Sequence, residues 1–181
     1  MIAGYAELEF DLPGALLREI VSLLEEMPSA ELTAANLANV SNEAGIYALL
    51  RSDDGALQYI GKAEGSKGLQ SRLIRHMRKL EGRQNIDAGS MHFKAIRVFV
   101  FTAMDIEASL LSHYGEGGSL PWNHSGFGSN DPGRERDTTT YKGGHFDTQH
   151  PIKLDHCFVQ FKPGRAPVSE VMQALKDGLP Y

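Results

Sequence analysis

The chain has 181 residues, 41% of them hydrophobic, and a formal net charge of -5 at pH 7, which suits one domain with a sizeable core rather than two full domains. Its single cysteine, Cys157, excludes an internal disulfide framework and a cysteine-based zinc site. Because no apolar run approaches membrane-spanning length and the acidic N-terminus is unlike a signal peptide, we expect no membrane partner and a cytoplasmic location.

Charge is distributed unevenly along the chain. Residues 1–55 hold ten acidic residues and two basic ones, whereas residues 62–97 hold nine basic residues and three acidic ones. A local excess of positive charge can bind phosphate whatever the net charge of the whole chain. An ordinary solvated helix would carry the same charges, so charge alone does not decide whether this region binds nucleic acid.

Apolar residues that recur every three to four positions predict helices. In chain order, these helices cover residues 15–27, 30–40 (a weaker candidate), 68–80, 104–114 and 167–176. Runs rich in β-branched and aromatic residues predict strands. In chain order, these strands cover residues 45–50, 57–61, 93–102 and 156–161. The long segment 115–151 is rich in Gly, Pro, Asn, Asp and Thr, and loops of that length are usually functional or disordered.

This order of elements predicts an α+β fold with a small antiparallel three-stranded sheet flanked by helices. We expect a single domain over residues 1–181. Within it, residues 1–43 form an N-terminal helical extension, 44–125 form the core, and 126–181 add a long loop, a strand and a helix.

The predicted hairpin contains the first candidate functional residues. Gly-Ile-Tyr at 45–47 and Tyr-Ile-Gly at 59–61 are separated by eleven residues. A three-residue loop over 53–55 would place Tyr47 and Tyr59 on the same sheet face, whereas an even-numbered loop would split them. Either tripeptide alone is typical of ordinary hairpin packing. Together, at this spacing, they resemble the two motifs that name the GIY-YIG nuclease superfamily.

The helix predicted after the hairpin carries Arg72 and His76 four residues apart on one face, at the edge of its apolar stripe. Taken singly, they suit a solvated cation and a satisfied boundary histidine. Members of the superfamily carry an arginine on this helix, often followed four residues later by histidine or tyrosine. The resemblance therefore implies that both residues are catalytic, although the link from Tyr59 to Arg72 is slightly longer than in the smallest members.

Glu107 is the candidate metal ligand. Its neighbours at helical spacing are Leu110, Leu111 and Tyr114, so the carboxylate falls on the inward side of its helix. A carboxylate there is costly unless it is paired or bound to a cation. The resemblance also implies one metal-binding carboxylate at this place, and hard oxygen ligation suits Mg²⁺ or Mn²⁺.

Asn123 follows Pro-Trp and matches an asparagine that is common near this point in the superfamily, where we expect it to brace the site. The Gly-Phe-Gly-x-x-Asp-Pro-Gly stretch at 126–133, with His150-Pro151 further on, resembles the Eco29kI-like branch of type II restriction endonucleases. The whole resemblance covers about residues 45–151.

The resemblance implies a metal-dependent endonuclease that hydrolyses double-stranded DNA, and its branch implies a restriction enzyme cutting a short palindromic site as a homodimer. Tyr47 would be the general base, or would relay its proton to His76. Tyr59 would orient the attacking water or a phosphate oxygen, and Arg72 would stabilise the developing charge. Free tyrosine has a pKa of about 10, so Tyr47 needs a nearby cation such as Lys62 or the metal.

Several basic residues are candidates for contact with DNA. They are Lys62, Arg75, Arg134, Arg136 and Lys142. The last three lie in the long loop, where arginine and lysine could contact guanine edges, although contact with phosphate is more frequent.

Two other functions compete with restriction. One is a standalone repair, recombination or anti-phage nuclease that recognises DNA structure rather than sequence. The other is a catalytically inactive DNA-binding module, which should lack at least one of Tyr47, Arg72 and Glu107, whereas all three are present.

Overall fold

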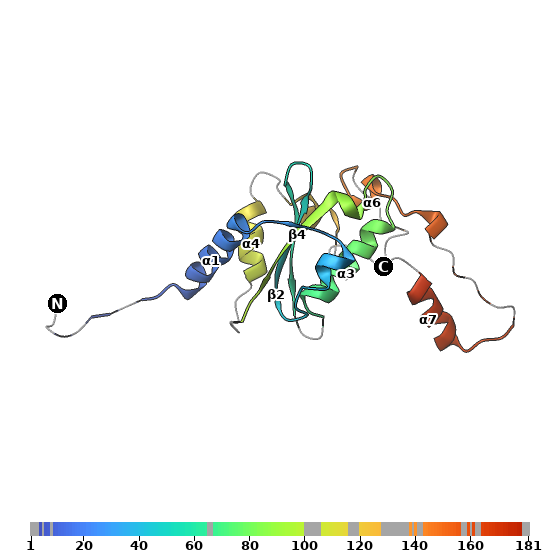
Figure 1. The fold of residues 1–181 in the computed structure, drawn as a ribbon, viewed down its shortest axis with the longest axis horizontal. Coiled ribbons are helices and arrows are strands. Elements are labelled where there is room, and N and C mark those ends of the chain that lie inside the picture. The colour runs from blue at the N-terminus through green and yellow to red at the C-terminus, as the bar shows by residue number, and fades with distance from the viewer. Residues whose placement is uncertain are drawn as a thin grey trace.

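The computed structural model of the chain has a mixed α+β fold (Figure 1). The structure describes residues 4, 6–7, 9–64, 67–99, 106–115, 120–127, 138, 140, 143–156, 159, 161 and 164–178. Among these residues, no helix combines the length and the apolar character needed to cross a membrane.

An open antiparallel sheet lies at the centre of the fold. In spatial order its four strands are β1 (Ala30–Glu31), β4 (Met91–Arg97), β2 (Gly45–Arg51) and β3 (Leu57–Ala63). The last three correspond to the strands predicted for the sheet, so the expected count of three is one too low.

The additional strand, β1, lies in a segment predicted as helix. Its two residues pair with His92 and Phe93 at the outer edge of β4. The helix begins only after Thr33, whose hydroxyl accepts a hydrogen bond from the Asn36 amide at 3.3 Å, and it is limited to α2 (Ala34–Leu37). Since an N-cap residue is itself non-helical, the segment before Thr33 remains extended and can join the sheet.

A β-bulge in β3 places the two motif tyrosines on the same face. The pairing register shifts after Leu49 because Gln58 is an extra residue on β3. Leu49 pairs with Tyr59, and Tyr47 lies two residues from Leu49, so both tyrosines point to one side. An unshifted register from the turn would pair Ala48 with Tyr59 and turn Tyr59 to the opposite side. Tyr47 and Tyr59 therefore share a face, as predicted, and they do so because of the bulge.

The sheet has a separate apolar core on each face. Tyr47 and Leu49 belong to the first core, whereas Ile46 and Ala48 belong to the second, as the alternation of a strand requires. The helices that contribute to the first core are α2, α3 (Leu69–Glu81), α5 (Pro121–Ser125) and α6 (Phe146–Gln149). The second core is covered by α1 (Leu12–Glu26) and α4 (Ile106–Gly115), which lie together on one side in Figure 1.

The C-terminal region differs from its prediction. Residues 154–156 form a short 3-10 turn (Leu154–His156) where the strand 156–161 was expected to begin, and Val159 and Phe161 are not in a strand. The other residues of that predicted strand lie outside the described ones. The final helix, α7 (Val168–Gly178), is present as predicted and none of its residues is buried.

The segment after α6 returns to the C-terminal end of α3. The Gln84 amide donates to the Pro151 carbonyl at 2.8 Å, and the Lys153 amide donates to the Gly82 carbonyl at 2.9 Å. This backbone pairing follows the end of α3, and the 3-10 turn Ala88–Ser90 then leads into β4. The extension is thereby attached to the helix that carries Arg72 and His76.

Candidate active site

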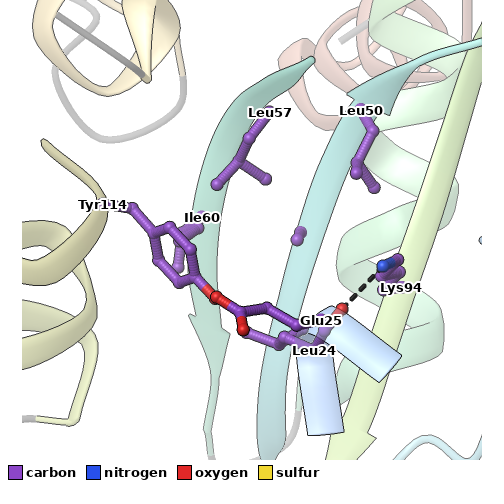
Figure 2. Close-up of a pocket in the computed structure, with 8 residues that line it drawn as sticks. Leu24, Glu25, Leu50, Leu57, Ile60, Lys94 and Tyr114 are labelled. Atoms are coloured by element: carbon purple, nitrogen blue, oxygen red, sulfur yellow. Dashed lines mark hydrogen bonds between the residues drawn. The ribbon is translucent and has the colours of Figure 1, made fainter. Parts of the chain in front are cut away.

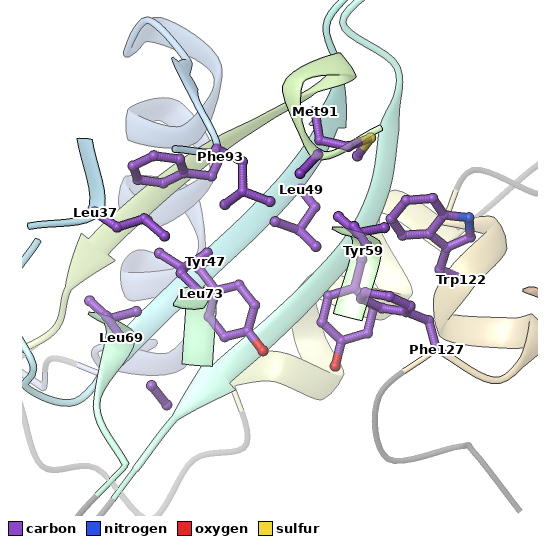
Figure 3. Packing of buried hydrophobic residues seen from close by; sticks show 14 of the residues in the cluster. Leu37, Tyr47, Leu49, Tyr59, Leu69, Leu73, Met91, Phe93, Trp122 and Phe127 are labelled. Atoms are coloured by element: carbon purple, nitrogen blue, oxygen red, sulfur yellow. The ribbon is translucent and has the colours of Figure 1, made fainter. Parts of the chain in front are cut away.

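Tyr47 and Tyr59 project from neighbouring strands with their hydroxyl groups pointing the same way (Figure 3). Their ring centroids are 6.0 Å apart. Gly61 makes room for both rings, because a Cβ at this position would lie 2.5 Å from Tyr47 Oη and 2.8 Å from Tyr59 Cε1. Any larger residue would displace the tyrosines, so the second motif requires glycine at this position for steric reasons.

His76 lies over Tyr47 on the inner face of α3. Its side chain is buried, and its Nε2 is 2.8 Å from Tyr47 Oη. The sequence placed this histidine at the edge of the apolar stripe, whereas the structure encloses it. A hydrogen bond between a phenol and an imidazole is the arrangement needed to move a proton between them.

Burial keeps both members of the Tyr47–His76 pair uncharged in the resting protein. It raises the pKa of Tyr47 far above its ordinary value, and the neighbouring Tyr59 raises it further. Burial also lowers the pKa of His76 to about 3, and the α3 cations, led by Lys79, add to that effect. Proton transfer from Tyr47 to His76 is therefore unfavourable until further positive charge comes close to Tyr47.

Arg72 lies one helical turn before His76 and is half-buried. Burial raises the pKa of Tyr47 and Tyr59, and the positive charge of Arg72 partly opposes both rises. Its Nε is buried without a hydrogen-bond partner in the described part of the chain. A buried donor left without an acceptor costs about 1–3 kcal/mol, and an anionic oxygen of a ligand would satisfy it.

Glu107 stands in the first turn of α4, where the helix dipole favours a negative charge. Burial is the largest cause of the raised pKa of Tyr59, and the charge of Glu107 is the next. The same carboxylate contributes to the raised pKa of Tyr47. Glu107 is therefore in electrostatic range of both phenols, although α4 packs on the opposite face of the sheet. Because β3 is the edge strand, the start of α4 can present a side chain past it.

A carboxylate such as that of Glu107 could hold a magnesium-type ion. Among the described residues, no three His, Cys, Asp or Glu side chains gather as a metal-binding group. Mg²⁺ is usually held by one or two carboxylates, with water and substrate phosphates in the other positions. Glu107 is half-buried and would supply one such carboxylate.

Asn123 is placed to brace the site. Its side-chain amide makes two hydrogen bonds to the backbone of one β3 residue: Oδ1 accepts from the Ile60 amide at 2.9 Å, and Nδ2 donates to the Ile60 carbonyl at 2.8 Å. The amide thus continues the sheet beyond its edge strand and fixes Tyr59 and Gly61 on either side of Ile60. Asn123 thus supports the strand that carries Tyr59, and its part in the chemistry of the site stays a prediction.

The structure does not bring Lys62 to the tyrosines. Lys62 pairs with Ile46 in the sheet, so it belongs to the opposite face, and its ammonium lies 3.4 Å from a Glu64 carboxylate oxygen. The predicted role of Lys62 in lowering the pKa of Tyr47 is therefore not supported by its position. Arg75 is exposed on α3, and its charge bears on both Tyr59 and His76. The other predicted DNA contacts, Arg134, Arg136 and Lys142, lie outside the described residues.

Two features that border the site were given no role in the sequence analysis. The first is Phe127, which is fully buried and stacks on His76 at a centroid distance of 4.8 Å. The second is a buried ion pair between Arg83 Nη1 and Asp147 Oδ1 at 2.5 Å. The glycine-flanked Phe127 was a usable signal, since Gly126 adopts a φ of +107°. No pattern in the sequence relates Arg83 to Asp147, which are far apart along the chain.

No protein-family model matches the chain, and no curated protein does. The candidate active site is therefore defined by the arrangement of its own side chains, Tyr47, Tyr59, Arg72, His76 and Glu107.

Proposed function

We propose that this protein is a metal-dependent DNA endonuclease of the GIY-YIG type, and that it acts as a type II restriction enzyme on a short palindromic site. The observation that carries the proposal is the hydrogen bond between Tyr47 and the buried, uncharged His76, within electrostatic range of Arg72. Two features of the sequence add support: the spaced tyrosine motifs and the position of Glu107.

Hydrolysis of a phosphodiester requires a deprotonated water, relief of charge on the phosphate, and release of the 3′ oxygen. Tyr47 accepts the proton of the attacking water while its own hydroxyl proton passes to Nε2 of His76. The water oxygen then bonds to phosphorus, the bond from phosphorus to the 3′ oxygen breaks, and the released 3′ oxygen takes a proton from solvent to become a hydroxyl. Arg72 donates to a non-bridging phosphate oxygen, and Tyr59 orients the water.

Glu107 would hold a divalent cation, which supplies positive charge for a phosphate oxygen and for the departing 3′ oxygen. The same positive charge would oppose the raised pKa of Tyr47, which burial otherwise keeps protonated. Since one active site cuts one strand, cleavage of both strands at a palindrome favours a homodimer with two-fold symmetry.

The test is cleavage of unmethylated plasmid and phage DNA in the presence of Mg²⁺, with Glu107→Gln as the inactive variant. Glu25→Gln is the matched control, because Glu25 lies beside the cavity on the opposite face of the sheet. Discrete fragments that Glu107→Gln abolishes and Glu25→Gln retains would establish a sequence-specific endonuclease.

Other outcomes select other functions. Nicking or a smear that depends on Glu107 would replace restriction by a structure-directed repair, recombination or anti-phage nuclease. Absence of cleavage with Mg²⁺ and with Mn²⁺, on duplex and on single-stranded DNA, would overturn the enzymatic proposal and favour a binding module.

A further inference from the structure

The imidazole of His76 is enclosed by aromatic rings. Tyr47 and Tyr59 approach it from the sheet with centroid distances of 5.5 and 5.4 Å, both at tilted angles. Phe127 covers it from another side at 4.8 Å and is nearly parallel to it, with 24° between the planes. Of the three, only Phe127 is stacked face to face.

His76 lacks the hydrogen bond that usually fixes an imidazole. When one ring nitrogen of a histidine is functional, the other is commonly held by a carbonyl or a carboxylate, which sets the tautomer and the ring orientation. Here Nδ1 is buried and has no hydrogen-bond partner within the described structure. Rotation about the terminal torsion of histidine is broad and roughly two-fold. The orientation that directs Nε2 at Tyr47 must therefore be maintained by packing as well as by the single bond to Tyr47.

Phe127 is itself rigidly placed. Its amide donates to the Trp122 carbonyl at 2.9 Å, and its ring lies 4.7 Å from the Trp122 ring. Gly126, just before it, has a φ of +107°, and a Cβ at Gly126 would collide with His145. The fully buried Phe146 packs edge-on against Phe127 at 4.9 Å.

The support continues to the ion pair in the C-terminal extension. The Arg83 guanidinium lies 5.1 Å from the centre of the Phe146 ring. Arg83 also pairs with Asp147 and donates to the His150 carbonyl at 3.1 Å. An unbroken series of contacts thus leads from the extension through Phe146 and Phe127 to His76.

The charged and titratable groups that face His76 come from three elements. They are Arg72, Arg75 and Lys79 on α3, Tyr47 on β2 and Tyr59 on β3. Lys79 also lies over the Phe127 ring at 4.7 Å. All three cations oppose a positive charge on His76, so water that entered beside the imidazole would be the main way to stabilise that charge.

We propose that Phe127 is a positioning residue of this active site: its ring orients the imidazole of His76 toward Tyr47 and excludes water from it, so that His76 remains an uncharged proton acceptor. This inference rests on the proposed nuclease function for its catalytic meaning. The effect on His76 itself is a property of the free protein and can be measured without DNA.

The test compares Phe127→Leu with Phe93→Leu. Phe93 is a buried phenylalanine of the same core, and it has no ring contact with His76. The measurement is the titration of the histidine side chains by ¹⁵N-imidazole NMR in the free protein. In wild type and in Phe93→Leu, His76 should stay uncharged at pH 5. In Phe127→Leu its pKa should return toward the ordinary value of about 6.5.

Cleavage gives a second readout. If His76 in Phe127→Leu titrates near the ordinary value of about 6.5, only about a tenth of it is uncharged at pH 5.5. The rate of that variant at pH 5.5, relative to pH 8, should then fall about tenfold more than the wild-type rate does. A purely structural role would lower the rate equally at both pH values.

An unchanged His76 titration in Phe127→Leu would overturn the inference whether or not the protein cleaves DNA. Conversely, a shifted titration in a protein without nuclease activity would retain the positioning role and reject the proposed function. If Phe127→Leu does not fold, Phe127→Met fills nearly the same volume without a ring and gives the same comparison.

Discussion

The two faces of the sheet are built differently. The face that carries Tyr47 and Tyr59 has its polar groups connected: phenol to imidazole, amide to strand backbone, and a buried guanidinium to a carboxylate. The face beneath α1 and α4 consists mainly of aliphatic side chains and leaves a cavity of about 140 Å³ (Figure 2).

The polar groups around this cavity lie at its edge. Lys94 donates to the Leu24 carbonyl at 2.6 Å, and the Tyr114 hydroxyl lies 3.5 Å from a Glu25 oxygen. Ala48, with its small side chain, also lines the cavity. Hydrogen-bonded polar side chains are thus concentrated on the face with the tyrosines. The opposite face contributes buried apolar side chains, and its packing leaves a cavity. Mutations on the two faces should therefore differ in kind, affecting activity on one and mainly stability on the other.

The largest contrast is expected from removing one hydroxyl on each face. Tyr47→Phe removes the proposed proton path to His76, and cleavage should fall about 10²- to 10⁴-fold, the usual contribution of general acid–base catalysis. Tyr114→Phe removes a hydroxyl beside the cavity and should leave the rate unchanged. Single-turnover cleavage of a mapped site measures both, and equal losses in the two variants would contradict the division of roles.

The buried ion pair should dominate the stability of the polar face. Arg83→Met leaves the largely buried Asp147 without its cation, and such a loss costs about 3–5 kcal/mol of unfolding free energy. Arg51→Met, which breaks the exposed pairs with Asp53 and Asp54, should not change stability measurably. Urea unfolding measures both variants. A small effect of Arg83→Met would mean that the extension is not attached through this pair.

Acid should weaken the protein through His76. Burial lowers the pKa of His76 to about 3 in the folded protein. As the pH falls below about 6.5, His76 therefore binds a proton in the unfolded chain but not yet in the folded protein. The associated stability is complete above that pH and is lost as the pH falls, by about 2 kcal/mol between pH 7 and pH 5.

Urea unfolding at the two pH values, in wild type and in His76→Gln, isolates this contribution. The variant should lose about 2 kcal/mol less stability on acidification than the wild type. His92→Gln removes a half-buried histidine of β4 whose ring nitrogen contacts the Ser29 hydroxyl, and it is the control for the loss of an imidazole elsewhere on the sheet. An unchanged pH dependence in His76→Gln would show that the imidazole is not kept uncharged by the fold.

The smallest effects are expected from substitutions that add one or two carbon atoms to a side chain on each face. Ala48→Val extends into the cavity and should raise the unfolding free energy by up to about 1 kcal/mol without changing cleavage. Gly61→Ala adds one carbon against both tyrosine rings and should reduce both stability and cleavage. Thermal unfolding and cleavage assays on the pair test the contrast. Loss of activity in Ala48→Val would show that the two faces are coupled.

Local patterns in the sequence predicted most helices and three of the four strands, because apolar periodicity is set by neighbours along the chain. They also predicted the pairing of Arg72 and His76 on one helix face, which follows from helix geometry alone. The short strand β1 was missed, since two residues carry no periodic signal and form a strand only because β4 offers an edge. The strand expected at 156–161 illustrates the opposite error: its strand-like composition predicted a strand, whereas His156 ends a 3-10 turn and neither Val159 nor Phe161 is in a strand.

The candidate site, too, was only partly predictable from the sequence. The sequence by itself determined which residues are candidates for the chemistry and the chain spacing that brings Tyr47 and Tyr59 onto adjacent strands. Only the tertiary structure decided that Gln58 bulges so that the tyrosines share a face, that Lys62 points away from them, and that Phe127 covers His76. The physical reason is that ring stacking, burial and ion pairing join residues distant in sequence. Their energies depend on where the whole chain folds rather than on any local pattern.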